Sequence, residues 1–224
     1  MRVSETVLPG VLLIEPAVFG DDRGYFLETW AAARYRENGI AVDFVQDNVS
    51  KSRLGTLRGL HLQHPHAQGK LVHVVTGEVF EVAVDVRLGS PTFGRWYGTV
   101  LSEANKRQLY IPPGYAHGFC VTSPEAIFAY KCSEGYHPEA ELTIAYDDPG
   151  LGVQWPVASP TLSKKDMAGK RLADIDPARL PRYVSSSPVS SSPVSSSPVS
   201  GGPVSGGPVS GGPEQGHHDR GHAR

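Results

Sequence analysis

The sequence predicts an all-β domain of the sandwich or jelly-roll type, and three observations support that class. In residues 82–86, valines alternate with alanine and aspartate, which is the period-two pattern of a strand. Glycine- and proline-rich turn signals separate similar runs at residues 77, 89–91 and 112–114. Helical patterns are scarce. Many short strands with few helices are typical of two packed sheets.

The one convincing helix before the C-terminal part of the domain is predicted over Trp30–Asn38. Thr29 is a suitable N-cap residue for it, and Gly39 is a suitable residue to end it. The strand-like segments have mixed polar and apolar faces. Such a sheet has one packed face, while its other face is either solvated or lines a cavity. The sequence does not distinguish these two possibilities.

The composition places the folded part of the chain in residues 1–183. Of the 224 residues, those from Ser185 to Pro213 are only Ser, Pro, Val and Gly, with a proline at every fifth position from Pro188 onward. Such a repeat buries too little apolar surface to offset the entropy of ordering. We therefore expect one domain, followed by a disordered tail over residues 184–224.

Charge and apolar runs exclude several classes of protein. Lys and Arg total 21 against 23 Asp and Glu, so no basic surface for a nucleic acid is expected. The longest early apolar run, Val11–Ile14, is too short for a signal peptide or a membrane span, which predicts no membrane contact and a cytoplasmic location. Cys120 and Cys132 lack C-x-x-C spacing, and both are expected to be buried, reduced thiols.

The most informative segment runs from Leu57 to Lys70. Arg58, His61 and Lys70 there place a guanidinium, an imidazole and an ammonium beside glycines that permit close approach of the backbone. These groups suit an anionic ligand and a proton transfer.

Four further motifs accompany that segment, at residues 21–24, 46–48, 112–118 and 130–132. With them, residues 1–183 resemble the dTDP-4-dehydrorhamnose 3,5-epimerase family of deoxysugar biosynthesis. The resemblance implies a cupin-type jelly roll (double-stranded β-helix) with a few short helices, and a dTDP-4-keto-6-deoxy-hexose substrate inverted at C3 and C5 without a cofactor. It also implies a homodimer, in which the N-terminal segment carrying Arg23 and Glu28 completes the partner's site.

The resemblance assigns four catalytic roles. His61 would be the base, and Asp166 would orient it, since a carboxylate on one ring nitrogen fixes the tautomer and makes the other nitrogen more basic. Lys70 would lie near the C4 oxygen and stabilise an enolate. Tyr130 would be the proton donor, because a phenol stays protonated at neutral pH.

Eleven positions match substrate contacts of the family. Those assigned to the sugar and diphosphate are Arg23, Gln46, Asp47, Asn48, Arg58 and Lys165. Those assigned to the thymidine are Glu28, Tyr136 and Glu141. Phe26 and His117 match positions that contact the ligand generally. Arginine forks suit diphosphate oxygens, and an aromatic ring suits a pyrimidine face.

Arg58 and His61 pose a geometric problem. Strict alternation along a strand sends residues three apart to opposite faces, yet the family uses both at one site. A bulge at Gly59 would resolve this, and we expect one there.

A metal-binding cupin is an alternative that the histidines raise. His64 and His66 form an H-x-H pair, and His117 matches the distant ligand of the second cupin motif. The carboxylate that should follow His66 by four or five positions is replaced by Lys70 and Leu71, which argues against a divalent ion, so no metal is expected.

Two further alternatives are a 3- or 5-monoepimerase of an antibiotic-sugar pathway and a non-catalytic nucleotide-sugar binding module.

Overall fold

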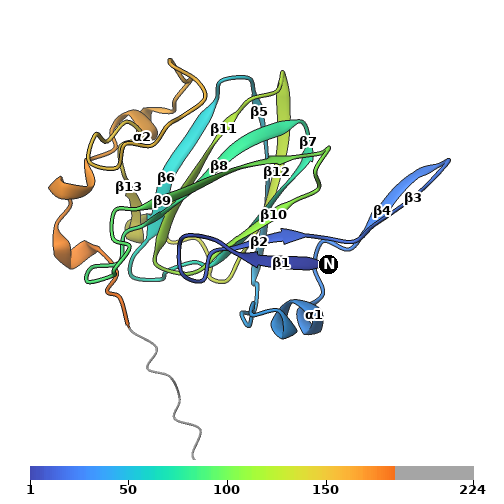
Figure 1. Cartoon of the computed structure of the whole chain (residues 1–224). Helices are drawn as coiled ribbons and strands as arrows, with labels where there is room; N and C mark the ends of the chain where they lie inside the picture. The colour runs from blue at the N-terminus through green and yellow to red at the C-terminus, as the bar shows by residue number, and fades with distance from the viewer. Residues whose placement is uncertain (185–224) are drawn as a thin grey trace, which may run out of the picture. The chain divides into compact units, whose positions relative to one another are not determined.

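The computed structural model describes residues 1–184, and most of its regular structure is antiparallel β-sheet (Figure 1). The predicted disordered tail falls, apart from Val184, outside the described residues.

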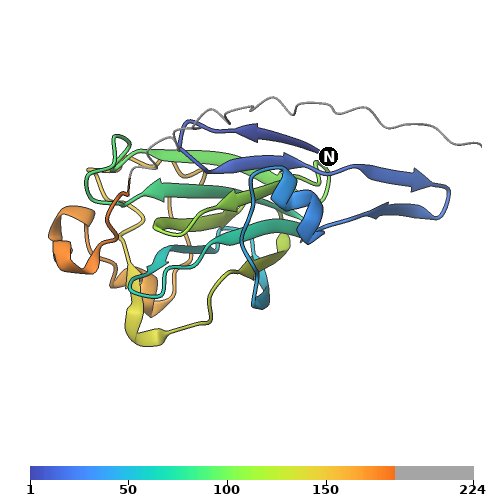
Figure 2. The same cartoon turned by 90° about the horizontal axis from the view of Figure 1, so that it is seen from below.

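Two sheets form a sandwich whose neighbouring strands come from distant parts of the chain (Figures 1 and 2). The six-stranded sheet has the order β1 (Arg2–Glu5), β2 (Leu12–Glu15), β10 (Gln108–Ile111), β7 (Lys70–Thr76), β12 (Glu125–Cys132) and β5 (Gln46–Arg53). The five-stranded sheet has the order β13 (Glu141–Thr143), β6 (Leu57–Gln63), β11 (Tyr115–Val121), β8 (Glu78–Asp85) and β9 (Trp96–Ser102). This arrangement confirms the predicted all-β, cupin-type jelly roll.

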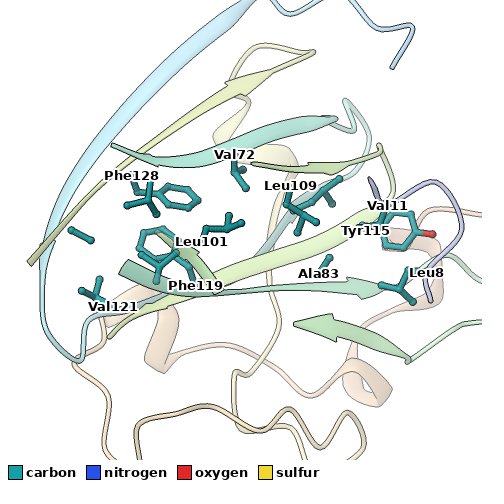
Figure 3. Close-up of a cluster of buried hydrophobic side chains, with 14 residues drawn as sticks. Leu8, Val11, Val72, Ala83, Leu101, Leu109, Tyr115, Phe119, Val121 and Phe128 are labelled. Atoms are coloured by element: carbon teal, nitrogen blue, oxygen red, sulfur yellow. The ribbon is translucent and has the colours of Figure 1, made fainter. Parts of the chain in front are cut away.

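The main core lies between the two sheets, as Figure 3 shows. Val72 and Phe128 enter it from the six-stranded sheet, and Phe119 and Val121 enter it from the five-stranded sheet. The rings of Phe119 and Phe128 stack with centroids 4.2 Å apart. Each such buried side chain stabilises the fold by about 1.5–3 kcal/mol.

The outer face of each sheet is covered as well. Tyr35 of helix α1 (Ala32–Glu37) and Ile40 pack on Leu12 and Ile14 of the six-stranded sheet.

The C-terminal segment, residues 151–180, covers the five-stranded sheet. Its Leu151, Leu172, Ile175 and Leu180 pack on Val82, Val84 and Val86. That segment contains α2 (Lys164–Met167) and the short 3₁₀ helices η2 (Leu172–Asp174) and η3 (Pro177–Arg179), while η1 (Pro138–Ala140) precedes β13. Strand β8 is therefore buried on both faces.

The predicted helix exists but begins later than expected. It starts at Ala32, and its N-cap residue, Ala31, has no side-chain cap, so the prediction that Thr29 caps it is wrong. The Thr29 carbonyl instead accepts hydrogen bonds from the Tyr35 hydroxyl and from Gln108, because the chain before the helix is anchored to the sheet. Gly39, with φ +89°, follows the helix end as expected.

One hairpin extends away from the sandwich (Figures 1 and 2). Its strands, β3 (Val18–Asp21) and β4 (Gly24–Leu27), pair only with each other among the described strands. Phe19 and Phe26 on this hairpin are 65% and 69% exposed. A hairpin that exposes two large aromatic side chains has an unusual surface for a protein monomer.

Both cysteines are free and buried, as the sequence predicts. Within residues 1–184, no helix has the length and apolar character needed to cross a bilayer.

Candidate active site

A cavity of about 650 Å³ opens beside the main core, and strands of both sheets line it. Strands β5, β7 and β12 contribute from the six-stranded sheet, β6 and β11 contribute from the five-stranded sheet, and the segment 161–166 closes one side. Eleven of the predicted site residues line this cavity: His61, Lys70, Tyr130, Asp166, Gln46, Asn48, Arg58, His117, Tyr136, Glu141 and Lys165.

A bulge in β6 brings Arg58 and His61 to the same face. Phe119 pairs with Arg58 and His117 pairs with His61, so one residue of β11 stands opposite two residues of β6. Gly59 has φ +130°, and a Cβ atom there would lie 2.5 Å from the Gly118 Cα atom. Only glycine fits this position, and the predicted bulge is confirmed.

His61 and Asp166 form a close pair. The His61 Nε2 atom lies 2.6 Å from Asp166 Oδ1, and the Ser163 hydroxyl donates to Asp166 Oδ2 at 2.6 Å. Burial by itself raises the pKa of the Asp166 carboxyl, but the hydrogen bonds from His61 and Ser163 outweigh burial and lower the pKa to about 2. Asp166 is therefore ionised at neutral pH, and it accepts the proton of Nε2. The His61 Nδ1 atom is left with a lone pair.

Lys70 is the first residue of β7, and it lines the cavity. Its ammonium donates to Gln68 Oε1 and lies 3.9 Å from the Cys132 Sγ atom. Burial lowers the pKa of Lys70, although nearby acidic groups oppose that shift. A partly desolvated cation attracts a developing negative charge strongly.

Tyr130 enters from β12, where it packs on the main core. Its ring centroid lies 5.9 Å from that of Phe128. Burial raises the pKa of the Tyr130 phenol, so the phenol holds its proton at neutral pH.

Polar groups at the edge of the cavity are linked to one another. Glu141 accepts hydrogen bonds from the Tyr136 hydroxyl at 3.0 Å and from Lys165 Nζ at 2.8 Å. On β5, Gln46 donates to Asn48 at 3.0 Å. These groups form a polar rim around the histidine, lysine and phenol.

Four predicted site residues lie outside the cavity. Arg23, Phe26 and Glu28 belong to the exposed hairpin and to the segment after it, where Arg23 pairs with Asp21 and Glu28 accepts a hydrogen bond from Arg34. Asp47 lies between Gln46 and Asn48 on β5, so alternation turns its side chain to the other face, where it binds Lys131 Nζ at 2.9 Å. The roles of these four residues stay predictions.

Sequence reasoning missed several polar residues at the site, and two of them pair with predicted site residues. Ser163 caps α2 and binds Asp166, and Ser163 with Asp166 is the S-x-x-D pattern of a capping box. Glu81 is fully buried and lies 2.8 Å from His117 Nδ1. Strand β8 carries three acids, Glu78, Glu81 and Asp85, and their spacing does not single out Glu81 as the one beside the site.

The histidines of the metal alternative do not converge. The His66 ring stacks on that of His137 with centroids 4.0 Å apart, and His117 is bonded to Glu81. Among residues 1–184, no group of three or more His, Cys, Asp or Glu side chains is arranged to hold a metal ion.

The cavity thus combines a histidine held by a carboxylate, a half-buried cation and a protonated phenol. These are the groups needed to remove a proton beside a carbonyl, stabilise the enolate and return a proton. The fold and the site define a jelly-roll epimerase.

Comparison with known proteins identifies the family. The sequence model described as dTDP-4-dehydrorhamnose 3,5-epimerase matches residues 5–174, and the chain belongs to this family. The dTDP-4-dehydrorhamnose 3,5-epimerase of Shigella flexneri is 53% identical over 178 residues, which cover 79% of this chain and 98% of that protein.

Solved structures agree with that assignment. The dTDP-6-deoxy-D-glucose-3,5-epimerase RmlC from Legionella pneumophila, in complex with dTDP-4-keto-L-rhamnose, superposes with a TM-score of 0.81 at 54% identity, covering 82% of this chain and 99% of that one. ChmJ, a 3′-monoepimerase from Streptomyces bikiniensis in complex with dTDP-quinovose, has a TM-score of 0.75 at 34% identity, covering 80% and 92% of the two chains.

Proposed function

We propose that this enzyme converts dTDP-4-dehydro-6-deoxy-D-glucose into dTDP-4-dehydro-L-rhamnose by inverting C3 and C5, without a cofactor. The observation that carries the proposal is the His61–Asp166 pair, whose free ring nitrogen shares one cavity with Lys70 and Tyr130. Relatives at 53% and 54% identity with this named activity support the double epimerisation.

The first step is removal of a proton from C3 or C5. Both carbons are adjacent to the C4 carbonyl, so their protons are acidic enough for a positioned base. His61 takes the proton at Nδ1, and the bonding electrons move to the C4 oxygen to give an enolate. Asp166 stabilises the resulting imidazolium through Nε2, at 2.6 Å.

Lys70 stabilises the enolate. Lys70 lines the cavity and its ammonium is partly desolvated, which strengthens its attraction to an oxyanion that exists only after proton transfer. Lys70 therefore lowers the barrier to enolate formation, in addition to binding the substrate.

Tyr130 returns a proton to the opposite face of the same carbon. Its phenol is protonated at neutral pH because burial raises its pKa. Each inversion leaves His61 protonated and Tyr130 ionised, and exchange with water restores both. Solvent hydrogen is thus incorporated at every inverted carbon.

The nucleotide binds at the polar rim. Arg58 and Lys165 are the cations of the rim, and they suit the diphosphate. Tyr136 supplies an aromatic face for the thymine, with Glu141 beside it at 3.0 Å.

A homodimer accounts for the hairpin. The exposed Phe19 and Phe26 give β3 and β4 an apolar surface suited to burial against a second copy. In that arrangement Arg23 and Glu28, which lie outside their own cavity, contribute to the site of the partner.

The location that we propose is the cytoplasm, because two free cysteines suit a reducing compartment.

Proton NMR of the substrate in deuterium oxide tests the reaction directly. Deuterium incorporation and inversion at both C3 and C5 are expected. Inversion at only one carbon would establish a monoepimerase, the activity named for ChmJ. Tight binding of the nucleotide sugar with no exchange at either carbon would indicate a non-catalytic binding module.

A further inference from the structure

A second histidine–carboxyl pair lies beside the first. His117 on β11 stands directly opposite His61 on β6, and Glu81 on β8 is its diagonal neighbour on the other side. The Glu81 Oε1 atom lies 2.8 Å from His117 Nδ1. The proposed reaction assigns no task to Glu81.

The surroundings of Glu81 disfavour a charge on it. The residue is 0% exposed, and its Oε2 atom has no hydrogen-bond partner within residues 1–184. An ionised carboxylate would leave one charged oxygen unpaired in the core, whereas a neutral acid leaves only a carbonyl oxygen. Burial raises the pKa of Glu81 well above its ordinary value, and the Lys70 ammonium on β7 opposes that shift only in part.

The surroundings of His117 disfavour a charge on the ring as well. Burial lowers the pKa of His117 well below its ordinary value, and the neighbouring Lys70 and His61 lower it further. An imidazolium paired with a carboxylate would place two charges in the core beside the Lys70 cation. A neutral acid and a neutral imidazole share one proton without creating a charge.

We propose that Glu81 is a neutral carboxylic acid that donates its O–H to His117 Nδ1 and so fixes the proton of His117 on Nε2. The ring lines the cavity, and Nε2 has no protein partner among the described residues. His117 is then a neutral hydrogen-bond donor to an oxygen of the bound ligand, and Glu81 is its positioning residue. Only the identity of that ligand rests on the proposed function.

The hydrogen bonds of the two histidine–carboxyl pairs therefore run in opposite directions: His61 donates to Asp166, whereas Glu81 donates to His117. Both Asp166 oxygens accept hydrogen bonds, from His61 and Ser163, and the ionised carboxylate leaves a lone pair on His61 that faces the cavity. Glu81 has one paired oxygen and donates, so His117 presents a proton to the same cavity. The environment of each carboxyl group decides whether its histidine acts as a base or as a donor.

NMR of the substrate-free enzyme, labelled with ¹⁵N-histidine, tests the proposal. Long-range ¹H–¹⁵N correlations report which ring nitrogen carries the proton, and His117→Gln identifies the signal. We expect the Nε2–H tautomer of His117, unchanged between about pH 6 and pH 8, where an unperturbed histidine titrates. Observation of an Nδ1–H tautomer or of an imidazolium would overturn the proposal.

Two variants of Glu81 extend the test. The amide of Glu81→Gln can donate to Nδ1 as the neutral acid does, so the Nε2–H pattern should persist. Glu81→Ala removes the donor, and His117 should then give the averaged signals of exchanging tautomers. If Glu81→Ala keeps a fixed Nε2–H tautomer, Glu81 does not position the ring.

Infrared difference spectra give a readout that needs no folded Glu81→Ala variant. Subtracting the spectrum of Glu81→Gln from that of the wild type at neutral pH should leave the carbonyl band of a protonated carboxylic acid. A carboxylate band in its place would contradict the neutral state. Because no turnover enters either measurement, failure of this proposal is distinguishable from failure of the proposed function.

Discussion

The Nε2 atom of His61 and Oδ1 of Asp166 lie 2.6 Å apart, although 105 positions separate the two residues in the chain. Strand β6 holds the histidine, and the capped first turn of α2 holds the aspartate. The pair depends on the packing of the C-terminal segment against the five-stranded sheet.

The first prediction concerns Asp166→Asn, which removes the acceptor of the Nε2 proton. An asparagine amide can donate to Nε2 and so favour the tautomer whose proton faces the cavity, which is not a base. We expect kcat to fall by about 10²–10⁴-fold, the contribution of a positioned general base, with little change in KM. Ser163→Ala is the matched control: it removes the hydroxyl that donates to the Asp166 carboxylate and accepts from the Asp166 backbone N–H, but it keeps the carboxylate, so its loss of kcat should be much smaller. Equal losses in the two variants would contradict the role of Asp166.

The second prediction concerns the alkaline limb of the pH profile of kcat. Burial lowers the pKa of Lys70 from 10.5, so its ammonium is lost as pH rises through that lowered value, and activity falls with it. The pKa of Tyr130 is raised by burial, so its phenol stays protonated over the same range. Because a guanidinium does not lose its proton in this range, Lys70→Arg should retain some activity and move the limb to higher pH.

Cys132→Ala is the control for that experiment, since its thiol lies 3.9 Å from Lys70 Nζ and also titrates in the alkaline range. Its limb should remain and should move only toward lower pH, because Cys132 opposes the lowering of the Lys70 pKa. A limb that disappears in Cys132→Ala and stays in place in Lys70→Arg would assign the titration to the thiol.

The third prediction concerns the bulge. Gly59→Ala places a Cβ atom 2.5 Å from the Gly118 Cα atom at φ +130°, and neither backbone can yield without breaking the pairing of β6 and β11. The free energy of unfolding should fall by at least about 1–3 kcal/mol, the cost of a strained backbone conformation. Urea unfolding measures it. Gly135→Ala, whose Cβ meets nothing within 4 Å, should be nearly neutral. A stable and active Gly59→Ala would show that β6 tolerates another register.

The fourth prediction concerns the shared site. If Arg23 acts in the partner's cavity, His61→Asn and Arg23→Ala should each be poorly active as homodimers. Refolding the two together should restore activity, because one site of each mixed dimer then has both native residues. Phe19→Ser with Phe26→Ser should shift the dimer toward monomer in sedimentation velocity. No recovery in the mixture, with mixed dimers demonstrated, would place Arg23 outside the partner's site.

Local chemistry explains which features could be predicted from the sequence. Alternating valines and turn residues predicted the strands, because these patterns are local. The bulge was predicted because the family resemblance places Arg58 and His61 at one site, which strict alternation along a strand does not allow. Thr29 was wrongly expected to cap the helix, since tertiary hydrogen bonds from Tyr35 and Gln108 take its carbonyl instead.

The pairing of Glu81 with His117 could not be predicted from spacing. It depends on two strands that are neighbours only in the folded sheet, where the two residues are diagonal neighbours. The turn of Asp47 away from the cavity is different, because alternation along β5 already places its side chain on the face opposite to Gln46 and Asn48.

The most direct test of the account compares solvent exchange in His61→Asn and Tyr130→Phe by proton NMR in deuterium oxide. His61→Asn should abolish both exchange and inversion at C3 and C5, because no enolate forms. Tyr130→Phe should retain exchange at one position while inversion falls by about 10²–10⁴-fold, because the base remains and the positioned acid is lost. Full epimerase activity in Tyr130→Phe, or exchange at the wild-type rate in His61→Asn, would contradict the assignment of base and acid.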